Sequence, residues 1–370
     1  MVTPGVNSKD ERRRNINIKI MAFTEEQFKS EFSEKTEELK RKNKELESRL
    51  QMYRREHGKL QVFFDEVIVS IEPFKELEPV VIPGVVKRGT PVSPVLHITD
   101  VHMGAVQDPN EIEGFNAYSP EITDSRMAEV TERWLKWASF QMKAYTMNEA
   151  SIIITGDLIS GDIHEELKTT NAFPAPVQVA RVSELISRQI AVIAPYFKAV
   201  TVHFISEDNH SRLTKKPQAK EAGMNSLNYL VGIMTKAYIA HLSNVKFNIY
   251  PMNEKVISVN DRLYLITHGH TIRGWMGVPW YGVERKVGKE ALARMQIIMQ
   301  EFERAKDIGF HKYVFGHFHT PIDTPLYSCG ASLQGTDAYD HQAGRYANPG
   351  LSAWLTHPRH GEFNRINFTL

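Results

Sequence analysis

Short apolar runs alternate with longer amphipathic segments over the last three quarters of the chain. Seven runs have the length and β-branched content of buried strands: VLHIT (95–99), SIIIT (151–155), VTVHFI (200–205), KFNIY (246–250), KVISV (255–259), LYLIT (263–267) and KYVF (312–315). Segments typical of helices lie at about 124–147, 177–195, 220–242 and 284–307. Strands separated by helices predict an α/β sheet with helices packed on it, and we assign this domain to residues 95–370.

A heptad pattern precedes this domain. Residues 24–60 contain no proline, and apolar or aromatic side chains recur every seven residues: Phe32, Leu39, Leu46, Tyr53 and Leu60. If these are d positions, Asn43 is an a position, where a buried Asn favours pairing with its own copy in a two-stranded coiled coil. The other a positions are weakly apolar, so a single amphipathic helix lying on the domain is the alternative. The sequence predicts a long helix over residues 23–60 and, in the coiled-coil case, a homodimer through residues 24–60.

Two segments without this periodicity flank the helix. Residues 1–22 are polar and contain three consecutive arginines, which is typical of a solvated, disordered basic tail. Residues 61–94 combine short apolar runs with five prolines, which predicts a linker with short strands.

Composition narrows the class of protein. A net charge of +1 over 370 residues excludes an overall electrostatic attraction to nucleic acid, so any such partner needs a local basic patch. The single cysteine, Cys329, cannot form an internal disulfide, which favours a reducing compartment. No apolar run approaches the roughly 18 residues of a membrane span, and the first twenty residues are too polar for a secretory signal. These features predict a cytoplasmic protein without a membrane segment.

Side chains able to bind metal follow five of the predicted strands. They are Asp100 and His102, Asp157, Asn209 with His210, His268 with His270, and His317 with His319. Open α/β sheets place their binding sites at the carboxyl ends of strands. A single histidine there is more often a structural residue, but five strand ends in register have no packing explanation. The pattern therefore predicts that these side chains converge on a metal site.

The residue types indicate which metal and how many ions. Carboxylate, imidazole and amide oxygen ligands suit Mn²⁺, Fe²⁺ or Zn²⁺, and the absence of thiolate ligands argues against a structural zinc site. Seven ligands are too many for one tetrahedral ion and fit two divalent ions that share a bridging ligand. Two such ions hold a phosphate oxygen and activate water for attack on phosphorus.

The ordered set DVH (100–102), GD (156–157), NH (209–210), HGH (268–270) and GHFH (316–319) resembles the calcineurin-like metallophosphoesterase superfamily. The resemblance spans about residues 95–320 and implies a β-sandwich flanked by helices. It also implies the following roles: Asp100, His102 and His319 hold the first metal; Asn209, His268 and His317 hold the second; Asp157 bridges; His210 stabilises or protonates the leaving oxygen; and His270 orients its neighbours. The ions implied are Mn²⁺ first, with Fe²⁺, Zn²⁺ or Mg²⁺ as alternatives.

One residue departs from the family pattern. The family reads Gly-Asn-His where this chain has Asp208 before Asn209, and Glu207 precedes it. Asp tolerates the backbone angles of Gly less well, and two added carboxylates would repel a phosphate. We therefore interpret Asp208 as a modulator of rate or substrate choice.

Several stretches bear on the substrate. GDLISGDIHEEL, SEDNHSRLTKKP and SLQGTDAYDHQAGR look similar to phage and bacterial members of the DNA repair exonuclease branch, which places the protein in a bacterial cell or a phage-infected host. One set of candidate substrate contacts is His164, Arg212, Lys215 and Lys216, of which the basic side chains could neutralise substrate phosphates. A second set is Arg273, Trp275 and Trp280, which combine a cation with aromatic rings on which unpaired bases could stack. The alternative for the basic residues is a solvated loop, and the alternative for the aromatic residues is a loop that packs on its own side chains.

Three functions follow from the sequence. The first is a two-metal nuclease that hydrolyses DNA phosphodiesters, and the resemblance adds an ATPase as a further expected partner. The second is a phosphodiesterase or phosphatase acting on a nucleotide or another small phosphoester. The third is a non-enzymatic assembly module on the same fold, which the intact ligand set argues against.

Overall fold

The computed structural model describes residues 33–49, 51, 68–69, 71, 89–273, 277–301, 303 and 308–370. The predicted basic tail, most of the predicted linker and Trp275 lie outside these residues. The chain divides into two compact units, residues 1–66 and residues 67–370. None of the helices among the described residues is both long and apolar enough to cross a membrane.

A helix over residues 33–49 confirms part of the predicted N-terminal helix. Leu39 and Leu46, at the predicted d positions, are 59% and 61% exposed. Ion pairs one turn apart line the helix, with 2.6 Å between Lys42 and Glu38. Such pairs support a solvated helix by a few tenths of a kcal/mol each. The coiled-coil dimer stays a prediction.

Light scattering of the full-length protein tests that dimer. If the heptads pair, the mass is twice 42.3 kDa, and Leu39→Asp with Leu46→Asp reduces it to that of one chain. Ser48→Asp, on the outer side of the same heptads, is the matched control and leaves the dimer intact. A wild-type mass of one chain at micromolar concentration contradicts the prediction.

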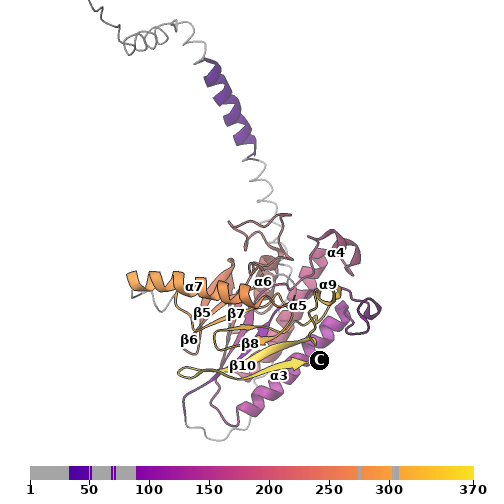
Figure 1. Cartoon of the computed structure of the whole chain (residues 1–370), viewed down its shortest axis with the longest axis vertical. Helices are drawn as coiled ribbons and strands as arrows, with labels where there is room; N and C mark the ends of the chain where they lie inside the picture. Colours follow the sequence, from indigo (N-terminus) through magenta and orange to yellow (C-terminus); the bar gives the residue numbers. More distant parts are fainter. Residues whose placement is uncertain are drawn as a thin grey trace, which may run out of the picture. The chain divides into compact units, whose positions relative to one another are not determined.

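Two sheets form the larger unit (Figure 1). The first has the order β11-β10-β1-β2-β3-β4, in which β1 to β4 are parallel and β10 and β11 are antiparallel. Its strands are β1 (Ser93–Ile98), β2 (Glu149–Ile154), β3 (Ala199–Ile205), β4 (Val245–Tyr250), β10 (Gly350–His357) and β11 (Gly361–Thr369). The second has the order β5-β6-β7-β9-β8. Its strands are β5 (Glu254–Val259), β6 (Arg262–Thr267), β7 (Lys312–Phe315), β8 (Ile322–Asp323) and β9 (Tyr327–Cys329).

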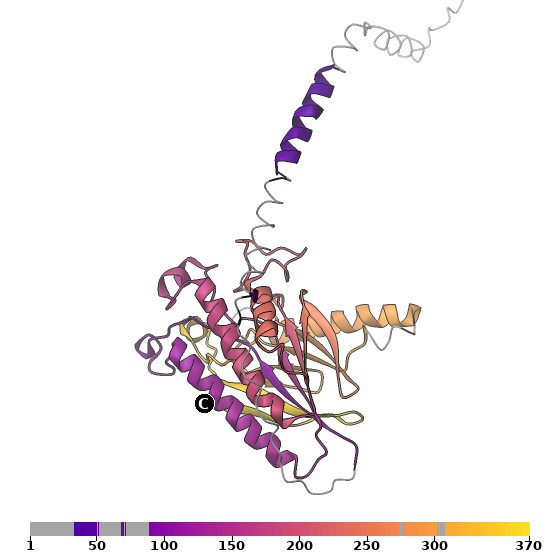
Figure 2. The same ribbon diagram turned by 180° about the vertical axis from the view of Figure 1, so that it is seen from behind.

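Helices cover the outer faces of the sheets. The principal ones are α3 (Pro120–Gln141), α5 (Ala175–Ile193), α6 (Leu227–Tyr238) and α7 (Trp280–Gln300). Shorter helices are α4 (Glu165–Thr170), α9 (Ala338–Gln342), η1 (Pro109–Ile112) and η2 (Ala194–Tyr196). Figure 2 shows α3 and α5 side by side, and α5 also contacts α6. Helix α7 packs against the second sheet through Val283 and Val287.

The main core lies between the two sheets. Val95 and Ile153 from the first sheet meet Ile257 and Val314 from the second, together with Trp354 of β10, and all are at most 3% exposed. Burying one such aliphatic side chain contributes about 1.5–3 kcal/mol. The arrangement confirms the predicted fold class, an α/β sandwich of two sheets flanked by helices.

Candidate metal centre

The predicted ligands follow five strands whose carboxyl ends meet. Asp100 follows β1, Asp157 follows β2, Asn209 follows β3, His268 follows β6 and His317 follows β7. Backbone hydrogen bonds connect neighbouring strand ends: the His102 amide donates to the Asp157 carbonyl at 2.9 Å. The two sheets therefore deliver the ligands from both sides of one site.

The backbone is strained where the ligands sit. Ten non-glycine residues in the described part of the chain have positive φ, and half of them are predicted ligands. These are Asp100 (51°), His102 (47°), Asp157 (45°), His317 (73°) and His319 (55°). Left-handed backbone costs a non-glycine residue about 1–3 kcal/mol and persists where the surrounding structure imposes it. Because such strain concentrates at functional sites, it supports this cluster independently of any motif.

One group consists of Asp100, His102 and His319, which are at most 7% exposed. The Nε2 atoms of His102 and His319 lie 3.1 Å apart. Asp100 Oδ1 is 3.6 Å from His319 Nε2 and 4.0 Å from His102 Nε2. This is the set that the family resemblance implies for the first metal.

The second group consists of Asp157, His268 and His317. His268 Nε2 lies 3.0 Å from Asp157 Oδ2 and 3.0 Å from Asn209 Oδ1, so the amide oxygen of Asn209 joins the group. Asp157 Oδ2 is also 3.9 Å from His102 Nε2 in the first group. Asp157 therefore lies between the two groups, as a bridging ligand must.

Hydrogen bonds on the far side of the imidazole rings fix which nitrogen faces the site. His268 Nδ1 donates to the Thr155 carbonyl at 2.9 Å, and His319 Nδ1 donates to the Asp340 carboxylate. Each bond leaves Nε2 directed at the cluster. Ligand histidines in metalloproteins are oriented in this way.

Burial and neighbouring charges shift the pKa values of the ligand histidines. Burial, followed by repulsion from other histidines, holds the pKa of His102 and of His317 well below the usual value, so both rings are neutral. Burial works to lower the pKa of His268, but Asp157 raises it to about 9. The pKa of His319 likewise rises to about 10 because Asp340 outweighs burial. Protons on these two rings thus compensate buried carboxylates, a role that divalent ions would take over.

The donor set fits two divalent ions. In the triad Asp100, His102 and His319, and in the triad Asp157, His268 and His317, the candidate ligand atoms lie within 4.8 Å of one another, and all are nitrogen or oxygen. Neutral imidazole with carboxylate oxygen suits Mn²⁺, Fe²⁺ and Zn²⁺.

Asp208 does not strain the backbone, so that part of our interpretation is wrong: its φ is not positive. Its carboxylate is buried and accepts hydrogen bonds from the Asp157 amide (2.9 Å), the Ser211 amide (2.8 Å), the Ser211 hydroxyl (2.5 Å) and the Asn228 amide group. The neighbouring Gly156 has φ +104°, and a Cβ there would lie 2.9 Å from the Asp208 Cβ. The carboxylate therefore holds the turn that carries Asn209 and His210 against β2.

Asp208→Gly is expected to lower both stability and rate. The change leaves buried donors without an acceptor, which costs about 2–3 kcal/mol of unfolding free energy, and it loosens the Asn209 turn. Asp208→Asn, which keeps one acceptor oxygen, should lose less. Urea unfolding and turnover of an aryl phosphodiester measure the two effects. A faster Asp208→Gly protein of unchanged stability would mean that Asp208 is inhibitory.

The other predicted site residues lie at different distances from the cluster. His210 is close, with Nε2 3.9 Å from Asp157 Oδ2, and the ring of His164 is 5.7 Å from the His210 ring. Arg212 turns back to its own loop, donating to the Asn209 carbonyl at 2.7 Å. His270 stacks on His268 with ring centroids 5.6 Å apart, as an orienting neighbour would.

The remaining predicted substrate contacts are solvent-exposed: Lys215, Lys216, Arg273 and Trp280. The carbonyl of Arg273 faces Gly282 in α7, where an added Cβ would lie 2.2 Å away. The loop at residue 273 therefore packs on α7.

Sequence reasoning missed the residues that follow β9. Asp340 accepts from His319 and pairs with Arg345 at 2.7 Å, so this carboxylate orients a ligand while its own charge is compensated. Asp337 caps α9 by accepting from the Asp340 amide at 2.7 Å. In the sequence, the stretch SLQGTDAYDHQAGR was noted only for its similarity to the DNA repair exonuclease branch. The signal that could have indicated a role at the metal site was the presence of two aspartates and an arginine in this short stretch.

A cleft of about 360 Å³ opens beside the cluster. His102 and His210 form its inner wall, and Ser160, Asn171 and Gln334 contribute polar groups. The remaining lining residues are Ala105, Val106, Gln107, Asp108, Glu111, Glu166, Leu167, Thr170, Asp337, Ala338 and Tyr339. The cleft therefore lies on the His102 and His210 side of the cluster.

Fold and site together define a two-sheet α/β protein with a candidate dinuclear metal centre. No protein-family model and no curated protein matches the chain. Solved structures similar to it include an archaeal phosphodiesterase (8% identity, 74% of this chain and 99% of that chain, TM-score 0.32). Another is a dimetal phosphatase from Danio rerio, with 9% identity over 75% of this chain and 99% of that chain and a TM-score of 0.37. A third is the calcineurin-like phosphoesterase YfkN from Bacillus subtilis, with 12% identity over 76% of this chain and 89% of that chain and a TM-score of 0.28. These sequence identities and TM-scores are too low to assign an activity.

Proposed function

We propose that the protein is a metal-dependent phosphodiesterase whose substrate is a small phosphodiester. The observation that carries the proposal is the pair of buried ligand groups with Asp157 between them. Asp100, His102 and His319 would hold one ion, and Asn209, His268 and His317 the other, with Asp157 shared. Two divalent ions at this position would supply charge neutralisation of the phosphate and activation of water.

His210 is the residue suited to act on the leaving oxygen. Its Nδ1 donates to the Ser160 carbonyl at 2.7 Å, which leaves Nε2 directed at the cluster. The ring lines the cleft and is 20% exposed, so it can meet a substrate there. A positioned imidazole that donates a proton contributes about 10²–10⁴-fold to a rate.

The cleft favours a small substrate over DNA. A duplex or single strand would need cations along its path, and Lys and Arg are absent from the described residues that line the cleft. DNA stays the second candidate because Lys215 and Lys216 are exposed on the loop that follows His210. The DNA-repair role, the ATPase partner and the choice of Mn²⁺ stay predictions.

Substrate profiling with Mn²⁺ tests the proposal. The protein is incubated with bis(4-nitrophenyl) phosphate, 4-nitrophenyl phosphate, single-stranded DNA and duplex DNA. We expect turnover of the aryl diester, loss of turnover in EDTA, and little cleavage of DNA. His317→Ala should lose turnover, whereas His360→Ala, an exposed histidine, should keep it. Preference for the monoester, or His317→Ala activity equal to wild type, contradicts the proposal.

A further inference from the structure

Tyr339 is an exposed aromatic residue in the wall of the cleft beside the metal cluster. It belongs to helix α9, is 69% exposed, and lines the cleft together with His102 and His210. Tyrosine is enriched where proteins bind partners and ligands, because its ring is apolar and its hydroxyl tolerates water. A single exposed ring is nevertheless common on protein surfaces, so its surroundings decide whether it serves a ligand.

A cation supports one face of the Tyr339 ring. The Arg345 guanidinium lies over the ring, with its Cζ 5.1 Å from the ring centroid. The Arg345 side chain is only 11% exposed, and its Nε and Nη2 both lie 2.7 Å from Asp340 Oδ1. The same Asp340 carboxylate accepts from the candidate ligand His319. With one face under the guanidinium, the high exposure of Tyr339 requires that much of the opposite face be open.

The short helix that carries this ring is fixed at both ends. At its start, the Asp337 carboxylate accepts from the Asp340 amide at 2.7 Å, and Gln107 Oε1 accepts from the Ala338 amide at 2.8 Å. At its end, the Arg345 amide donates to the Asp340 carbonyl at 2.8 Å. A ring on such a support loses little conformational freedom when it binds a ligand, which favours affinity.

The surroundings of the ring suit a flat, uncharged group. A planar group would stack on the open face, opposite the guanidinium. The cleft volume of about 360 Å³ is that of a site for a small organic ligand, and Val106 and Leu167 add apolar surface to its lining. Because Lys and Arg are absent from the described residues that line the cleft, a neutral base is favoured there over a second phosphate.

We propose that the substrate is a nucleoside phosphodiester whose base stacks on Tyr339 while its phosphate lies at the metal cluster near His210. This inference rests on the proposed phosphodiesterase function and names its substrate class. Every base has a planar face, so stacking selects for a nucleoside without reading which base it has. One base beside one phosphate differs from a DNA strand, whose further phosphates would need cations along their path.

Two methyl phosphodiesters that differ only in the base test the inference. One is thymidine 5′-(methyl phosphate), and the other is its 1,2-dideoxyribose counterpart, which has hydrogen in place of the base. Dissociation constants come from ligand-observed NMR titration of the metal-free protein, and kcat/KM comes from chromatography of reactions with the Mn²⁺-loaded protein. We expect the thymidine ester to be favoured about 5–30-fold in both measurements, as stacking of one base on an aromatic ring predicts.

Variants of Tyr339 show whether the ring causes this preference. Tyr339→Leu keeps an apolar side chain but removes the ring, and it should reduce the preference to about twofold or less. Tyr339→Phe keeps the ring and should keep the preference. Tyr346→Leu is the matched control: Tyr346 is 51% exposed, its ring centroid lies 5.1 Å from that of Phe115, and it is not among the residues that line the cleft. This control should bind and hydrolyse both esters as wild type does.

The outcomes separate this inference from the proposed function. Equal treatment of the two esters by the wild-type protein, or a base preference that survives in Tyr339→Leu, overturns the inference. Failure of the Mn²⁺-loaded protein to hydrolyse any diester, bis(4-nitrophenyl) phosphate included, overturns the proposed function instead. The base preference is then still measured from the dissociation constants of the metal-free protein.

Discussion

Asp157→Asn is expected to lower phosphodiester turnover by about 10³-fold while the fold is kept. Asp157 Oδ2 lies 3.0 Å from His268 Nε2 and 3.9 Å from His102 Nε2, so its charge serves both ligand groups. Asn has the same shape and tolerates the left-handed backbone at this position, where φ is 45°. The loss would therefore come from the missing charge. Rates on bis(4-nitrophenyl) phosphate and bound manganese per chain measure it.

Asp261→Asn is the matched control for that change. Asp261 also has positive φ, 64°, but it lies in the exposed turn between β5 and β6. The control should keep wild-type metal content and rate. Activity of Asp157→Asn within tenfold of wild type would show that the carboxylate does not bridge two ions.

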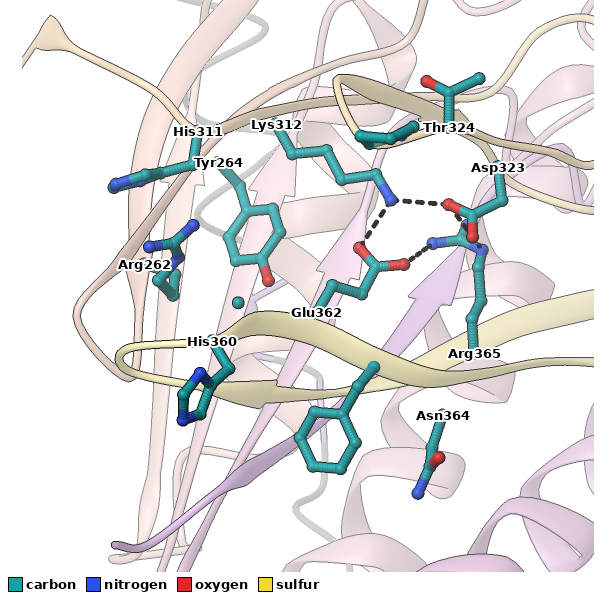
Figure 3. A pocket seen from close by; sticks show the side chains of 13 residues that line it. Arg262, Tyr264, His311, Lys312, Asp323, Thr324, His360, Glu362, Asn364 and Arg365 are labelled. Atoms are coloured by element: carbon teal, nitrogen blue, oxygen red, sulfur yellow. Dashed lines mark hydrogen bonds and ion pairs between the residues drawn. The ribbon is translucent and has the colours of Figure 1, made fainter.

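Lys312→Met is expected to destabilise the protein by about 3 kcal/mol without changing the chemistry of the site. Figure 3 shows Lys312 between two carboxylates, with its Nζ 2.6 Å from Asp323 Oδ1 and 3.1 Å from Glu362 Oε2. Arg365 completes the network, 2.7 Å from Glu362 Oε1. Lys312 and Glu362 are 9% exposed as side chains, so removing the ammonium leaves a buried carboxylate with one partner fewer. Breaking a buried pair from one side costs more than the pair contributes.

Urea unfolding measures the Lys312 effect. Lys289→Met, an exposed lysine of α7, is the control and should change the unfolding free energy by less than about 0.5 kcal/mol. Metal content should stay at the wild-type value, because Lys312 begins β7 and His317 lies beyond the other end of that strand. A loss of unfolding free energy below about 1 kcal/mol for Lys312→Met would contradict this account, because it would mean that the carboxylates are stable without the Lys312 ammonium.

The sequence indicated the strands on which the site depends. All seven predicted runs are strands: six of them have a parallel neighbour, and β5 pairs antiparallel with β6. Each run is rich in apolar and β-branched residues, which are typical of strands that pack on a core. Strands β10 and β11 were missed: Ser352 and Thr356 interrupt the first, and polar residues alternate through the second. Strands β8 and β9 have only two and three residues, too few for a periodic signal.

The convergence of the ligand side chains could be predicted from the strands that they follow. The identity of the side chains that orient those ligands could not be predicted from the sequence. Asp340 reaches His319 from helix α9, and Asp208 reaches Asp157 from a neighbouring strand end. Those contacts depend on tertiary geometry, which no spacing in the sequence specifies. The cleft could not be predicted from the sequence either, because Glu111, Glu166 and Gln334 come from three distant segments.

Metal stoichiometry tests the central claim most directly. The full-length protein is stripped with chelator, dialysed against excess Mn²⁺, and assayed by elemental analysis alongside crystals measured at the manganese absorption edge. We predict two ions per chain, one near Asp100 and His319 and the other near His268 and His317, with Asp157 between them. Manganese that never exceeds background, or anomalous peaks only elsewhere on the chain, would contradict the dinuclear centre and the hydrolase proposed from it.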